Sequence, residues 1–145
     1  MSVRENIASN LLSVISAISS PDIIKATRQP FLLDELSDKQ YPAVIVQTSE
    51  ENRDDSELGT GARTRHGTID FVVLGFVKGA ESNIDTARNA LITAIETALE
   101  SDITRNNKAL DTEITQVETD EGTLFPVGGI RMVVRCVYQF NAGTP

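Results

Sequence analysis

The chain has 145 residues, enough for one domain with its own hydrophobic core and too few for two of ordinary size. Apolar residues make up 40% and charged residues 23%, which excludes a disordered chain, and no apolar run approaches the roughly 20 residues that span a bilayer. The net charge of −8 argues against binding to DNA or to a membrane surface by this chain alone. With one cysteine and no visible secretory signal, residues 1–145 are expected to form a single soluble, acidic domain in a reducing compartment.

The N-terminal residues predict a helix. Ser2 and Glu5 have the spacing of a capping box, in which each side chain binds a free backbone N–H of the first turn. Apolar residues then recur at spacings of three and four as far as Ile18, and Pro21 stops the pattern. We expect this helix to pack on a sheet; a helix that binds a partner is the alternative.

Residues 22–48 predict one short and one longer strand. Ile23 and Ile24 can begin a short strand, which Gln29-Pro30 interrupts, and residues 31–35 read as a covered loop. Tyr41 to Thr48 is short and rich in β-branched residues, as is typical of a strand.

Residues 49–64 are polar and predict a long, solvated and mobile loop. The segment holds two arginines, two glycines and five acidic residues, namely Glu50, Glu51, Asp54, Asp55 and Glu57. The acids lack the spacing of a calcium-binding loop, so a solvated excursion is the simpler interpretation.

Residues 68–77 predict a long strand with two unequal faces. One face is apolar throughout, whereas the other becomes apolar only toward the end, at Val72, Leu74 and Phe76. A second subunit is a candidate to cover that second face.

A second helix follows from about Ser82 to Ser101, with apolar residues at a period near 3.6 and Arg88 on the margin of the stripe. Residues 113–119 alternate weakly and predict an exposed strand. The clearest pattern is the last, because apolar residues occupy every even position from Ile130 to Phe140. The predicted fold is α+β: an antiparallel sheet of about four main strands with two helices on one face, in the order α-β-β-α-β-β.

A search for catalytic or metal-binding residues finds no convincing set. His66 is the single histidine and lies near a loop, Cys136 falls on the apolar face of the last strand, and the glycine pairs lack a phosphate-loop context. We therefore expect no enzyme activity, no cofactor and no metal site. Two arginines, Arg131 and Arg135, share the mixed face of the last strand, where acids of a neighbouring subunit could pair with them.

The whole-chain arrangement resembles the tail terminator and tail-completion proteins of bacteriophages, the group of minor tail protein U. The resemblance rests on an N-terminal helix beginning VRENI, YPAVIV at 41–46, RTRHG at 63–67, a helix with ARNALITAIETAL, TDEG at 119–122 and a last strand closing with VYQF. It covers nearly the whole chain as order and pattern, and no single motif is diagnostic.

The resemblance implies a structural virion protein with no active site. Such proteins form a ring, typically a hexamer, that caps the head-proximal end of the tail tube, stops its growth and joins head-completion or neck proteins. DNA would pass through the lumen without specific binding, and no membrane would be involved. A neck adaptor is the alternative within this class, and a small ligand-binding or enzymatic domain with residues 49–64 as a lid is the alternative outside it. The candidate contact residues are Val72, Leu74, Phe76, Arg131, Arg135, the five acids of 49–57, Arg63 and Arg65.

Overall fold

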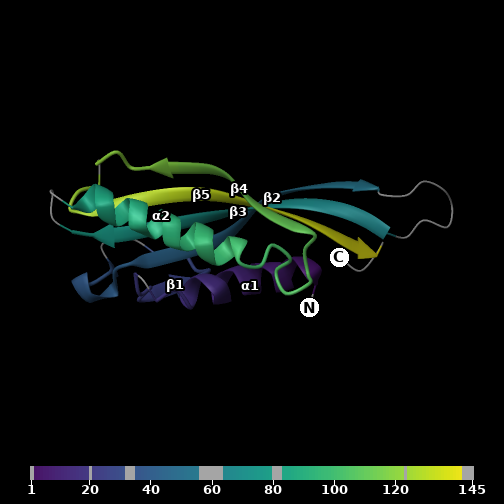
Figure 1. Cartoon of the computed structure of the whole chain (residues 1–145), viewed down its shortest axis with the longest axis horizontal. Coiled ribbons are helices and arrows are strands. Elements are labelled where there is room, and N and C mark those ends of the chain that lie inside the picture. The colour runs from purple at the N-terminus through teal and green to yellow at the C-terminus, as the bar shows by residue number, and fades with distance from the viewer. Residues whose placement is uncertain are drawn as a thin grey trace.

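The computed structural model describes residues 2–19, 21–31, 35–55, 64–79, 83–122 and 124–141. In these ranges, helices α1 (Val3–Ser16) and α2 (Ile84–Glu100) lie along one face of a five-stranded sheet (Figure 1). The strands are β1 (Lys25–Thr27), β2 (Ala43–Asp55), β3 (Thr64–Lys78), β4 (Asp111–Thr119) and β5 (Val127–Asn141), and a short 3-10 helix, η2 (Asp38–Gln40), precedes β2.

The order of strands across the sheet is β1-β2-β3-β5-β4. β1 pairs in parallel with β2, and the other neighbouring pairs are antiparallel. The α+β class is confirmed, but the prediction of about four antiparallel strands was incomplete. β1 adds a fifth strand of three residues, directly after Ile23 and Ile24, where the sequence indicated that a short strand can begin; its parallel pairing with β2 was not predicted.

The central strands are longer than their hydrophobic patterns suggested. β3 and β5 pair over fifteen residues each, from Thr64 opposite Asn141 to Lys78 opposite Val127. The prediction of a loop over 49–64 was wrong for residues 49–55, which continue β2 and pair with β3 from Glu51 onward, and for Thr64, which begins β3. Residues 56–63 lie outside the described part of the chain.

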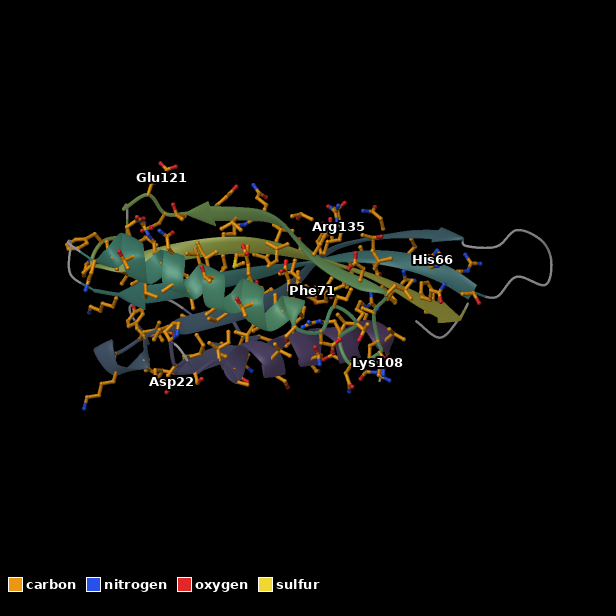
Figure 2. All side chains as sticks on the ribbon, in the orientation of Figure 1. Asp22, His66, Phe71, Lys108, Glu121 and Arg135 are labelled. Atoms are coloured by element: carbon orange, nitrogen blue, oxygen red, sulfur yellow. The ribbon has the colours of Figure 1, made fainter. Side chains whose placement is uncertain are left out.

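The hydrophobic core lies between the sheet and the two helices. Phe71 is fully buried there, on the helix side of β3 (Figure 2). Each layer contributes residues at the period of its element: Ile7, Leu11 and Ile15 from α1, Leu91, Ile95 and Leu99 from α2, Ile69 and Val73 from β3, and Met132, Val134 and Cys136 from β5.

The helix ends differ slightly from the prediction. The Ser2 hydroxyl accepts a hydrogen bond from the backbone N–H of Glu5 at 3.1 Å, as the capping pattern predicts. The helix then ends at Ser16, before Pro21, so proline is not what stops it. α2 begins after Asn83, whose side chain makes no capping bond, and Ser82 lies outside the described residues.

Arg88 of α2 is buried, at 7% exposure, where the sequence placed it on the margin of the helix. Its guanidinium pairs with Asp120, at the turn between β4 and β5, and with Asp85 at 2.8 Å. A Cβ on Gly128 would lie 2.8 Å from the Arg88 Cγ, so a glycine is needed for the arginine to pass. This ion pair fixes the start of α2 to the end of β4.

The sheet extends beyond both helices at the end where β2 finishes and β3 begins (Figure 1). His66 lies on this extension (Figure 2), and its Nε2 is 2.7 Å from the Gln139 Nε2 on β5. Gly67 packs against the ring of Tyr138, because a Cβ there would come within 2.6 Å of the ring. The extension is therefore held by ladder hydrogen bonds and a few close side-chain contacts.

Candidate assembly surface

The sheet face opposite the helices is the candidate assembly surface, and we call it the outer face. It comprises the side chains of Val72, Leu74 and Phe76 on β3, Arg131, Val133, Arg135 and Val137 on β5, and their register partners on β2 and β4. All seven are partly exposed, so the second face of β3 is apolar and incompletely covered, as the sequence predicted.

The chain itself covers part of the outer face near β1. The Phe31 ring packs edge-on against Phe76, with the ring centroids 6.1 Å apart. Ala43 and Ile45, which lie opposite Phe76 and Leu74 on β2, are 0% and 4% exposed. The apolar patch that remains open is therefore centred on β3 and β5, where Val72 lies directly opposite Val133.

Arg135 already has an acidic partner within the chain. Its Nε donates to the Asp70 carboxylate at 3.0 Å, directly across from it on β3. The Asp70 bond, and then the charges of Asp70, Glu113 and Glu50, raise the pKa of Arg135. Figure 2 shows this side chain projecting away from both helices. Arg135 therefore has an acidic partner in its own chain, and no acid from a neighbouring subunit is needed to pair with it.

Arg131 differs from Arg135. It lies between Leu74 of β3 and Glu118 of β4 in the register of the sheet. Within the described part of the chain, no hydrogen bond or ion pair to Arg131 is formed. It borders a hollow of about 190 Å³ whose apolar lining includes Leu74, Phe76 and Leu124. A partly exposed cation beside an apolar hollow suits an acidic group from another molecule.

Glu50 and Glu51, the two acids of 49–57 whose side chains are described, act at different places. Glu51 lies on the helix side, where it accepts hydrogen bonds from the Tyr138 hydroxyl and from Arg4 at 3.2 Å. Burial, and then the neighbouring Glu51 carboxylate, raise the pKa of Tyr138 to about 12. Glu51 thus ties the start of α1 to the sheet, whereas the Glu50 charge acts on Arg135.

The remaining candidate residues lie on the sheet extension or outside the residues that the structure describes. Asp54 and Asp55 belong to β2, opposite His66 and Arg65. Arg65 is exposed at the beginning of β3. Glu57 and Arg63 lie outside the described residues. Those of the predicted contact residues that the structure describes therefore fall in three places: the outer face, the α1 contact and the sheet extension.

Asp70 is the residue that sequence reasoning missed on this surface. The signal was present, since Asp70 is in phase with Val72, Leu74 and Phe76 along β3. The register that places it opposite Arg135 was not readable from one sequence, because it depends on how β3 and β5 align.

The described residues contain no cluster of three His, Cys, Asp or Glu side chains able to hold a metal ion. Cys136 is fully buried, with its sulfur 3.6 Å from the Thr112 hydroxyl, and burial raises the pKa of its thiol to about 11. At neutral pH this thiol stays protonated, which makes it a packing residue and not a nucleophile. No helix in the described ranges is long and apolar enough to cross a membrane.

No protein-family model matches the chain, and no curated protein sequence matches it. Among solved structures, it aligns with a chain of the "virion of native gene transfer agent (GTA) particle". The alignment covers 96% of this chain and 92% of that chain, at 13% identity and a TM-score of 0.43. A likeness at that TM-score does not establish a common fold.

Proposed function

We propose that this chain is a structural virion protein, a tail terminator that forms a ring on the head-proximal end of a phage tail tube. In this proposal it is not an enzyme. The ring stops polymerisation of the tube and offers a joining surface to head-completion or neck proteins. The protein assembles in the host cytoplasm, resides at the neck-proximal end of the tail in the virion, and makes no contact with a membrane.

The observation that carries the proposal is the outer face of the sheet. Val72 and Val133 lie at the centre of an apolar patch that no described helix covers. Partly exposed apolar patches bordered by charged residues are typical of protein contact sites. The sequence resemblance to tail terminators supplies the class of partner, namely other virion proteins.

The net charge of the chain is compatible with a ring through which DNA passes. At −8 per chain, a ring of several copies carries a large negative charge. Such a lumen repels the phosphates of DNA and lets the duplex slide without binding.

The experiment uses a phage or phage-like particle whose genome encodes this chain. Antibodies raised against the purified chain are expected to label virions at the junction of head and tail. Deleting the gene is expected to give tails of uncontrolled length. Labelling at the distal tail tip, or normal tails in the deletion strain, would contradict the proposal.

The same deletion separates the terminator from a neck adaptor. An adaptor acts after the tail has reached its length, so its loss is expected to leave tails of normal length unattached to heads. Loss of a terminator changes the length distribution itself. Measuring tail lengths by negative-stain microscopy therefore decides between the two.

A further inference from the structure

Each edge strand of the sheet has an exposed large apolar residue on it or directly before it. β4 forms one edge and β1 the other. Val117 of β4 is 40% exposed, and Leu110, directly before that strand, is 50% exposed. Ile24, directly before β1, is 51% exposed.

β4 is an open edge whose protection consists of three acidic residues and a bulge. It has a neighbouring strand, β5, on one side only, and all but Thr112 and Ile114 of its residues are exposed. Natural edge strands often carry a lysine or a proline that blocks pairing with another chain, and β4 has neither. A bulge near Thr115 leaves the second half, around Val117, as the regular part of the edge.

The two edges have opposite charge. β4 carries Asp111, Glu113 and Glu118 and no basic residue. Residues 23–30, which include β1, carry Lys25 and Arg28 and no acidic residue. Arg28 pairs with Glu5 of α1 at 3.3 Å. The Lys25 ammonium lies 5.2 Å from the centroid of the Phe31 ring, and no described acid pairs with it, so it is the basic group left at this edge.

We infer that the β4 edge binds the β1 edge of a second copy of this chain, extending the sheet from one subunit into the next. The inference rests on the proposed ring, for which it names the subunit contact. Two different surfaces meet in this contact, so it can repeat from copy to copy and close into a ring. The outer face then remains available to a different virion protein.

Charge selects this pairing over contact between two β4 edges. Two copies of β4 would place glutamate and aspartate side chains opposite one another, which destabilises a strand pair. β4 beside β1 instead brings acids next to Lys25 and covers Val117 and Ile24 together.

The test uses two single variants of the full chain and a matched control. Val117→Lys and Ile24→Glu each introduce a charge of the same sign as the edge that it should meet. Both positions are exposed, so the fold is expected to tolerate them, which circular dichroism checks. Thr93→Lys, on an exposed position of α2, is the control.

Sedimentation velocity follows association from about 10 μM to about 1 mM, a range in which even a millimolar contact populates dimers. The wild-type chain and Thr93→Lys are expected to associate equally. Each edge variant alone is expected to lose at least about tenfold in association constant, since burying an unpaired charge is unfavourable. An equal mixture of the two variants keeps one intact pair of edges and places the new lysine opposite the new glutamate in the other pair, so it is expected to recover association.

Three outcomes would overturn the inference. They are a wild-type chain that stays monomeric at the highest concentration, edge variants that associate like the wild type, and an effect of Val117→Lys without any effect of Ile24→Glu. The tail-length experiment is independent of these results. A normal terminator phenotype together with unaffected edge variants would reject the edge contact and leave the proposed function standing.

Discussion

Replacing Asp120 by asparagine tests the buried ion pair that connects α2 to the β4–β5 turn. The side chains of Arg88 and Asp120 are 8% and 6% exposed, so water does little to screen this pair. Asp120 also accepts a hydrogen bond from the backbone N–H of Leu124 at 3.0 Å. The change removes the negative charge while keeping the size of the side chain, and it leaves the Arg88 charge buried.

The expected cost follows from that burial. Breaking a buried ion pair by removing one partner costs about 3–5 kcal/mol, and the remaining bond from Arg88 to Asp85 favours the low end, about 3 kcal/mol. With an m-value of about 2 kcal/mol/M in urea, the midpoint of unfolding should fall by about 1.5 M. Asp85→Asn is the control, because Asp85 is 74% exposed and a surface change should stay within about 0.5 kcal/mol.

The same pair predicts the sign of the pH dependence. Burial acts to raise the pKa of Asp120, but the bonds from Leu124 and Arg88 outweigh it, and the net pKa lies below its ordinary value. A depressed carboxyl pKa stabilises the fold above the unfolded pKa of about 3.9, and this contribution is lost as the pH falls through the folded value. The gap between wild type and Asp120→Asn should therefore narrow below about pH 4. A gap of under about 1 kcal/mol at pH 7 would refute the reasoning.

Three further changes test other contacts. Arg135→Glu should destabilise the fold by about 1 kcal/mol, since it removes the Asp70 ion pair and puts a fourth carboxylate beside Asp70, Glu50 and Glu113. Arg131→Glu removes no ion pair of the described residues and meets Glu118 alone across the strand, so it should cost less, about 0.5 kcal/mol; equal urea midpoints would count against the assigned pairing. Cys136→Ser should cost about 1–3 kcal/mol, and the native thiol, with its pKa of about 11, should react with a bulky reagent only as fast as the chain opens; rapid labelling would show that it is accessible. Gly67→Ala should cost about 1–3 kcal/mol in thermal unfolding, because the new Cβ meets the Tyr138 ring; an unchanged midpoint would mean that the ring moves aside freely.

The elements with a buried face could be predicted from the sequence. The alternation from Ile130 to Phe140 gave the last strand its two faces, and the period of 3.6 residues gave α2 its buried stripe. Both patterns arise because one face of each element is removed from water. It could not be predicted that Arg135 has an acidic partner and Arg131 has none among the described residues, because the register between β5 and β3 decides which arginine lies opposite Asp70.

Residues 49–55 show why a polar strand is hard to predict from the sequence. Both faces of β2 leave the hydrophobic core there, so no alternation is required, and the strand is defined by its pairing with β3. The burial of Arg88 could not be predicted for a different reason. Its charge suggests a surface position until Asp120, 32 residues later in the chain, is brought beside it.

The position of β4 at the edge of the sheet is the feature that is hardest to predict from the sequence, and the order of the strands explains why. The exposed large apolar residues between positions 103 and 125 follow no period. β5 enters the sheet between β3 and β4, which leaves β4 outermost and places Val117 on an open edge. Had β4 paired with β3 instead, the acids Glu113 and Glu118 would lie inside the sheet, without the arginines of β5 opposite them. The acidic composition of β4 thus suits a strand that pairs with the arginine-bearing β5 on one side and meets a basic edge on the other.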